Sequence, residues 1–187
     1  DLQPAAVCTV TSNVDSGAGT LRTCLQNAVA GATVLFSPSA FPPSTPGTIH
    51  LSSELPRIRV NNLTMHGRDA GVVIDGSGLG GQPVGLRVDG SNCVVIRGLQ
   101  IVGVSCGVGL WRGASNCIVG GDRAVGNGPM GQGNRLSNNR HVGIELQGSS
   151  TTNNQIRGNL IGTNSIGQGS NGNETGVFMV LGTSNNV

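Results

Sequence analysis

The sequence predicts an all-β fold in which successive turns of the chain stack as a β-solenoid. One phrase, Gly-apolar-variable-apolar, recurs with copies that begin at Gly85, Gly107, Gly143 and Gly176. Each copy is followed by a short polar turn, an Asn and further apolar residues. The composition, with 32 Gly and 2% aromatic residues, suits a narrow coil filled by Val, Ile and Leu and closed by tight corners.

The N-terminal segment predicts a short strand at residues 7–10 and then the one helix of the chain, over 20–29. Gly31 can end this helix. A short amphipathic helix at this place would act as a lid over the apolar end of the first turn. The residues at helical spacing are Leu21, Cys24, Leu25, Ala28 and Val29.

Strand patterns fill the rest of the chain. We expect a single domain over 1–187, with the N-terminal strand and cap helix in 1–31 and the rungs in 32–187. From Gly85 onward we expect three strands per rung, and the Gly- and Asn-rich inserts 120–134 and 162–173 form corner loops. The early strands lie at 33–36, 48–51, 55–60, 63–67 and 72–76, and the clearest rung has strands at 85–89, 93–97 and 99–104.

Charge and cysteine content indicate which binding partners and which cellular location to expect. A formal charge of +2, with no dense basic patch in the sequence, predicts no nucleic-acid partner. No stretch approaches the roughly 20 apolar residues that cross a bilayer, so we expect no membrane span. Five Cys favour an oxidising, secreted or cell-surface location, with any signal peptide already removed before Asp1.

Several segments resemble one family. Residues 10–22, 31–36, 47–51 and 73–76 are similar to the N-terminal region of secreted bacterial parallel β-helix proteins of the pectin-lyase-like superfamily. Residues 154–163 resemble the rung consensus of its surface proteins. The resemblance implies a right-handed parallel β-helix. It leaves function open, because this fold hosts lyases, hydrolases, adhesins and structural proteins.

The outward positions of the repeat predict no active site. Aligning the repeats places Asp89, Trp111, Gln147 and Val180 in one outward column. A second column holds Arg87, Gly109, Glu145 and Phe178. Neither column can hold a metal cluster or a pair of carboxylates, so we predict no catalytic residue, no metal site and no cofactor.

Three further side-chain patterns have an ordinary structural interpretation. Arg97 and Arg157 precede Gly in equivalent strands and could line an anion or sugar-acid groove, but solvated outward Arg is the commoner explanation. His66 and His141 lack neighbours at metal-ligand spacing. The spacing of His141 and Glu145 would fit an acid/base pair, although such spacing often arises by chance.

The cysteines predict structural cross-links. Cys8 and Cys24 would pin the lid helix to the first strand. Cys93 and Cys117 each follow Ser-Asn in adjacent rungs, where stacking at about 4.8 Å permits a disulfide. Cys106 is then left over, but pairing it with either of the latter two would leave a different free thiol.

Asn residues gather at the predicted corners, where stacked amides can hydrogen-bond from rung to rung. We interpret this ladder as structural. The residues are Asn92, Asn116, Asn138, Asn139, Asn153, Asn154, Asn185 and Asn186.

The sequence stops at Val187 without a capping helix or a polar final rung, which would leave an edge that recruits other strands. Two explanations stay open, a fragment of a longer β-helix or an end that receives another subunit. A candidate interaction surface consists of Val187 and the outward residues Trp111, Phe178 and Val180. We expect a non-catalytic secreted structural β-solenoid that self-associates head to tail, then a surface-polysaccharide-binding stalk or adhesin, then a polysaccharide lyase or hydrolase.

Overall fold

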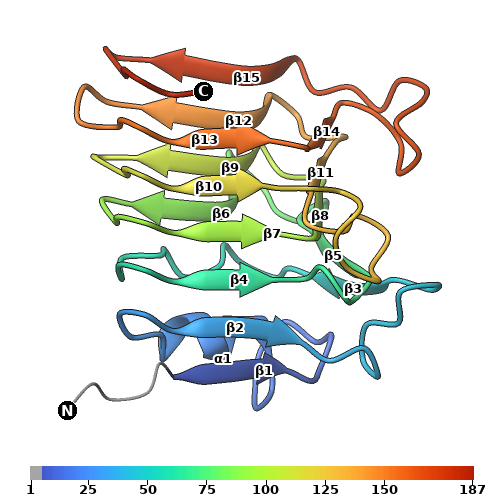
Figure 1. Cartoon of the computed structure of the whole chain (residues 1–187). Helices are drawn as coiled ribbons and strands as arrows, with labels where there is room; N and C mark the ends of the chain where they lie inside the picture. The colour runs from blue at the N-terminus through green and yellow to red at the C-terminus, as the bar shows by residue number, and fades with distance from the viewer. Residues whose placement is uncertain (1–5) are drawn as a thin grey trace.

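The computed structural model describes residues 6–187, and these form parallel strands in three sheets that we name A, B and C. Figure 1 shows the strands stacked in layers from β1 to β15. Sheet A contains β1 (Val7–Val10), β2 (Thr33–Phe36), β4 (Thr64–His66), β7 (Val95–Arg97), β10 (Ile118–Gly120) and β13 (Gln155–Arg157). Sheet B contains β3 (Gly47–His50), β5 (Val72–Asp75), β8 (Leu99–Val102), β11 (Arg135–Leu136) and β14 (Leu160–Ile161). Sheet C contains β6 (Val84–Asp89), β9 (Cys106–Trp111), β12 (Val142–Gln147) and β15 (Thr175–Val180).

Every strand pair is parallel, and from β6 onward the chain visits sheets C, A and B in turn. Alternate side chains of each strand point inward, so that Ile96, Ile101, Leu110 and Ile144 are completely buried in one core. The predicted all-β stack of parallel strands is therefore confirmed.

The helix α1 (Leu21–Gln26) lies between β1 and β2 and is shorter than predicted. Thr20 caps its first turn, where the Thr20 hydroxyl accepts a hydrogen bond from the backbone N–H of Thr23. The helix ends at Asn27, so Val29 is 53% exposed rather than part of the buried face. The inward residues are Leu21, Cys24 and Leu25.

Of the two predicted disulfides, one is present. Cys8 and Cys24 are bonded, with their Cα atoms 5.7 Å apart, which fastens α1 to β1. The prediction of a Cys93–Cys117 bond is wrong, because both thiols are free. Val95 pairs with Ile118, so the residue level with Cys93 is Asn116 and not Cys117. Cys117 is buried in the core, whereas Cys93 is partly exposed at the corner.

Asn residues at the corners have two separate roles. One set has a positive φ of 53–60° and turns the chain into sheet A. Asn tolerates this conformation better than most residues. Cys93 occupies the same position in one turn, with φ 56°. The set is Asn62, Asn116, Asn153 and Asn185.

The second set points inward and forms hydrogen-bonded ladders. Asn154 accepts a hydrogen bond at Oδ1 from the Cys117 N–H (2.9 Å) and donates from Nδ2 to the Ala114 carbonyl (3.0 Å). Asn186, one turn later, accepts at Oδ1 from Asn154 Nδ2 at 2.9 Å. Similar ladders join Asn134 to Asn159 and Asn139 to Asn173. The predicted structural ladder therefore exists, at three corners.

Candidate functional site

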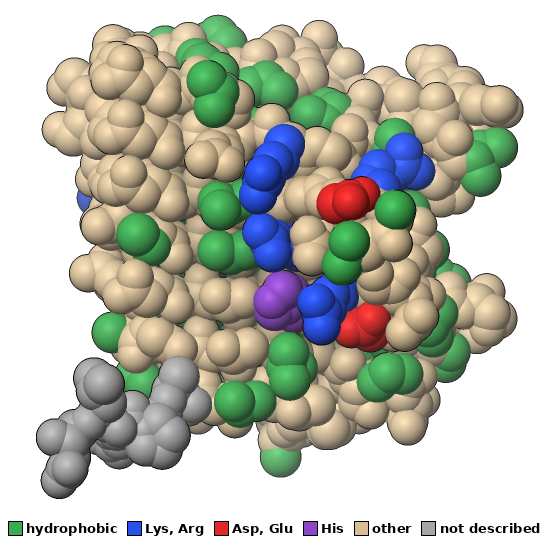
Figure 2. All heavy atoms as spheres, in the orientation of Figure 1, with side chains coloured by type: hydrophobic (Ala, Val, Ile, Leu, Met, Phe, Trp, Pro, Cys, Tyr) green, Lys and Arg blue, Asp and Glu red, His purple; other side chains and the backbone are tan. Residues whose placement is uncertain are grey.

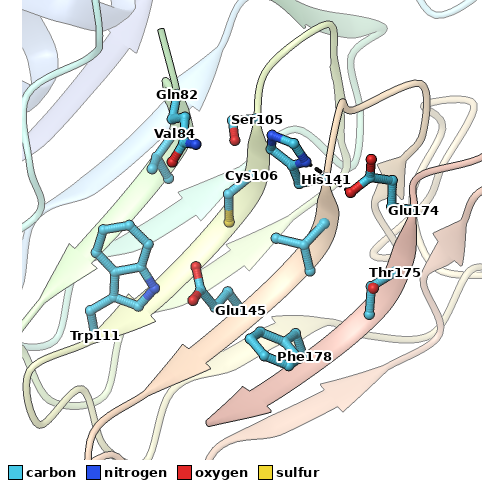
Figure 3. Close-up of a pocket in the computed structure, with 11 residues that line it drawn as sticks. Gln82, Val84, Ser105, Cys106, Trp111, His141, Glu145, Glu174, Thr175 and Phe178 are labelled. Atoms are coloured by element: carbon cyan, nitrogen blue, oxygen red, sulfur yellow. Dashed lines mark hydrogen bonds and ion pairs between the residues drawn. The ribbon is translucent and has the colours of Figure 1, made fainter. Parts of the chain in front are cut away.

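The outer face of sheet C carries a pocket of about 360 Å³ that spans several turns of the stack (Figure 3). The strand register places Arg87, Gly109, Glu145 and Phe178 in one column, as predicted from the repeats. The neighbouring column holds Asp89, Trp111, Gln147 and Val180. The pocket is lined by Gln82, Val84, Ser105, Cys106, Trp111, His141, Val142, Glu145, Glu174, Thr175 and Phe178.

The floor of the pocket is apolar. Val84, Cys106 and Val142 lie in register on adjacent strands and form a small buried cluster outside the main core, with Trp111 packed against it. Burial raises the pKa of the Cys106 thiol, and the negative charge of Glu145 acts in the same direction. Cys106 is therefore a small apolar group in this pocket rather than a nucleophile.

Two aromatic side chains border the pocket. Trp111 is half-buried, and the Arg87 guanidinium lies 4.3 Å from the centroid of its ring. This cation–π contact holds the indole in place. Phe178 is 46% exposed. Both belong to the predicted interaction surface, and the structure brings them together around Glu145 (Figure 3).

The other two members of the predicted surface do not line this pocket. Val180 follows Phe178 on β15 and pairs with Gln147. Val187 lies at sheet A, where its backbone N–H donates to the Asn154 carbonyl at 2.9 Å. The predicted single surface is therefore divided between two parts of the molecule.

Ionisable groups lie along the opposite side of the pocket. His141 Nδ1 is 2.8 Å from Glu174 Oε2 (Figure 3). Burial raises the pKa of Glu145, while the nearby Trp111 indole acts in the opposite direction. The Trp111 N–H is buried without a hydrogen-bond partner among the described residues and points toward Glu145 (Figure 3).

The prediction concerned the repeat columns alone, and the second carboxylate of the pocket comes from outside them. Of the carboxylates in the repeat columns only Glu145 lines this pocket, and Glu174 enters it from the end of the insert that precedes β15. Sequence reasoning also left out Cys106 and Thr175. Their signal is present in the sequence, since both stand directly before the Gly that begins a copy of the repeat.

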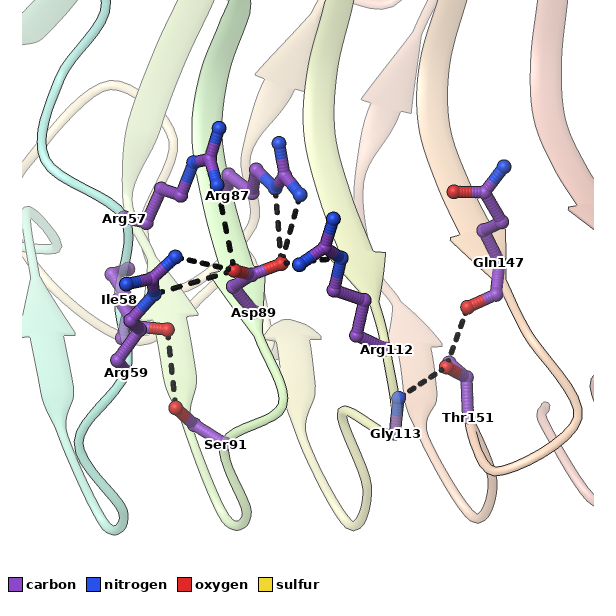
Figure 4. A network of polar contacts seen from close by, with 10 residues as sticks. All are labelled: Arg57, Ile58, Arg59, Arg87, Asp89, Ser91, Arg112, Gly113, Gln147 and Thr151. Atoms are coloured by element: carbon purple, nitrogen blue, oxygen red, sulfur yellow. Dashed lines mark hydrogen bonds and ion pairs between the residues drawn. The ribbon is translucent and has the colours of Figure 1, made fainter.

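An ionic network borders the pocket beside Trp111 (Figure 4). Asp89 is 3% exposed and accepts from Arg87 NH2 at 2.9 Å and from Arg59 NH2 at 3.2 Å. Arg57 and Arg112 lie 3.8 and 3.7 Å from the same carboxylate. Burial raises the pKa of Asp89, but the hydrogen bonds from Arg87 and Arg59 outweigh it and leave the pKa below 3.8. The network holds Arg87 over Trp111.

The described residues contain no group of three or more His, Cys, Asp or Glu side chains placed to hold a metal ion. Within residues 6–187, no helix has the length and apolar character needed to span a membrane. In comparisons with known proteins, no family model, curated protein or solved structure matches the chain.

Proposed function

We propose that this chain is a non-catalytic extracellular β-solenoid that binds a neutral carbohydrate in the sheet C pocket. The observation that carries the proposal is the pocket itself, in which two aromatic side chains face carboxylates over an apolar floor. We also propose a more specific description of the fold. It is a right-handed β-helix with three strands per rung, capped by α1 and related to the pectin-lyase-like proteins. The segment resemblances and the repeated sheet order C, A, B support it.

The chemistry of the pocket suits a sugar. Aromatic faces offer large apolar area at low entropic cost, and a sugar ring presents C–H groups to them. Carboxylates such as Glu145 and Glu174 accept hydrogen bonds from hydroxyl groups.

The ionisable groups favour binding over catalysis. Glycoside hydrolysis needs one carboxylic acid and one free carboxylate on opposite sides of the scissile bond. Glu174 is paired with His141, and the Cys106 thiol is protonated because burial raises its pKa. The alternative is a hydrolase or lyase, which the experiment below distinguishes from a carbohydrate-binding protein. The Cys8–Cys24 bond supports an oxidising, extracellular location.

The single Trp of the chain lies in the pocket and reports on binding through its fluorescence. We expect titration with neutral hexasaccharides of glucose, mannose or xylose to change the emission for at least one sugar. Phe178→Ala should weaken that binding about fivefold, because an aromatic contact contributes about 1 kcal/mol. Ile166→Ala removes an exposed apolar side chain (69%) outside the pocket and is the control.

Two results would contradict this proposal. The absence of any response to the panel, or binding that Phe178→Ala leaves unchanged, would remove the carbohydrate site. Release of reducing ends that Glu145→Gln abolishes would instead identify a hydrolase.

The last strand favours a second candidate, head-to-tail self-association. Val177 and Met179 on β15 are 38% and 47% exposed, whereas Ile144 and Leu146, their partners on β12, are completely buried. A second copy stacked on β15 would cover both residues. We expect sedimentation to show concentration-dependent assembly that Val177→Asp abolishes, and a monomer at all concentrations would contradict this candidate.

A further inference from the structure

We infer that the outer face of sheet A is a second binding site, one that takes sulfate or phosphate ester groups carried on an extended polysaccharide. The groups that form it are His66, Arg68, Arg97 and Arg157. This site goes beyond the proposed function, because it lies on a different sheet from the pocket beside Trp111 and binds through charge.

The strand register aligns these groups along the stack, where Arg68, Arg97 and Arg157 are cationic while burial and the charges of Arg68 and Arg97 lower the pKa of His66. His66 on β4 pairs with Arg97 on β7. Gly120 on β10 pairs with Arg157 on β13. The residue before Gly120 pairs with the residue before Arg97, so Gly120 lies between the two Arg residues in the stack. At about 4.8 Å per turn, Arg97 and Arg157 are about 10 Å apart along the stack. Figure 2 shows Arg and His side chains gathered in a band on this face.

The cations in this band have few counter-ions. Among the described residues, Arg97 and Arg157 form no ion pair, and Arg97 donates only to the Gly120 carbonyl, at 3.2 Å. Burial lowers the pKa of Arg97, and the positive charges of Arg157 and Arg68 lower it further. Three like charges therefore lie close together, and the one ion pair that they form is between Arg68 and Asp69. An anion would relieve their repulsion.

His66 supplies an independent observation that points to a ligand. Its Nδ1 atom is buried and has no hydrogen-bond partner in the described part of the chain. With Arg68 and Asp69 it lines a pocket of about 290 Å³, whose other wall is formed by Phe36 and its neighbours. A buried polar atom without a partner is uncommon in folded proteins, and a bound oxyanion is a partner that fits here.

The insert 120–134 fixes one side of the band. It reaches back to the segment after β4, where the Asn127 N–H donates to Asp69 Oδ1 at 3.0 Å and the Gly128 N–H donates to the Arg68 carbonyl at 2.7 Å. Figure 1 shows this loop descending from β10 along the stack. The backbone that carries Arg68 and Asp69 is therefore held in place before any ligand arrives, which reduces the entropic cost of binding.

The type of cation favours a tetrahedral oxyanion. All eleven basic residues of this chain are Arg, and Arg presents a fork of donors that binds phosphate or sulfate with two hydrogen bonds. His66 and Arg68 lie at the end of one turn and Arg97 lies on the next, so the three side chains approach from two levels of the stack and can contact different oxygens of one tetrahedral group. Arg157 is placed for a second ester group farther along the same polymer.

Calorimetry with sulfated dextran, phosphorylated dextran, unmodified dextran and polygalacturonate tests the site. We expect the two esterified dextrans to bind and the other two polymers not to bind. Arg97→Gln and Arg157→Gln should each weaken binding about tenfold or more, because a charge-assisted hydrogen bond contributes about 1.5–3 kcal/mol. Which ester binds more tightly distinguishes sulfate from phosphate as the natural group.

Arg112→Gln is the control, since it removes one exposed positive charge beside sheet C. An equal loss in this variant, or equal binding of polygalacturonate or duplex DNA, would show a generic charge effect and overturn the inference. Arg157 is exposed, so its replacement leaves the fold intact. Phe178→Ala should leave sulfated dextran binding unchanged, so the two proposed sites can fail separately.

Discussion

The early and late turns of the stack place different residue types at the same inward corner positions. At the corner that leads into sheet A, the inward position is Leu63, then Val94, then Cys117, and in the later turns Asn154 and Asn186. At the other two corners, an apolar residue of the early turns is likewise replaced by Asn in the late turns. Leu99 is followed by Asn134 and Asn159, and Val104 is followed by Asn139 and Asn173.

The difference shows how this chain accommodates its inserts. An apolar corner contributes through burial and needs the chain to continue directly from one strand to the next. An inward Asn accepts a backbone N–H of the preceding turn and donates to a carbonyl of that turn, so it can anchor a chain that returns from a long loop. Asn134 and Asn173 stand where the inserts end. The amide corners thus allow the loops that border both proposed sites.

The largest expected effect separates the early turns from the late ones. Replacing Cys8 and Cys24 with Ser removes a cross-link across 16 residues, which should lower the free energy of unfolding by about 3 kcal/mol. Hydrogen exchange should accelerate in β1 and β2 while β12 and β15 keep their protection. Equal acceleration in all turns would show that the stack unfolds as one unit and that the two regions are not distinct in stability.

A smaller effect is expected from Asn154→Leu in the late turns. Leu fills the volume but leaves the Cys117 N–H and the Ala114 carbonyl buried without partners, which should cost about 2 kcal/mol. Urea denaturation measures this loss. The control is Asn153→Gly, which keeps the positive φ of 58° and should change stability by less than about 0.5 kcal/mol. If Asn154→Leu is as stable as the wild type, the amide ladder does not stabilise the late turns.

Sequence reasoning reached the stack and the sheet C columns because a strand repeats every second residue and a rung repeats its Gly phrase. It failed where an offset of one residue in the strand register decides which side chains are level with each other. Cys93 and Cys117 both follow Ser-Asn, yet the strand pairing offsets them by one position. It also failed for Glu174 and for the approach of Arg97 to His66 and Arg68, because a loop brings Glu174 into the pocket and the strand register places Arg97 beside His66.

The smallest expected effect tests the turn where the two regions meet. Cys93 has φ 56° in a column otherwise occupied by Asn, and its Sγ donates to Asn92 Oδ1 at 3.2 Å. Because Asn adopts this conformation with less strain, Cys93→Asn should raise the free energy of unfolding by about 0.5–1 kcal/mol. The same substitution should remove the only thiol that reacts with a maleimide in the native protein, since burial raises the pKa of Cys117 to about 11 and that of Cys106 further still. A destabilised variant, or native labelling that persists after the change, would mean that the corner before β7 differs from the Asn corners and that register alone does not determine its conformation.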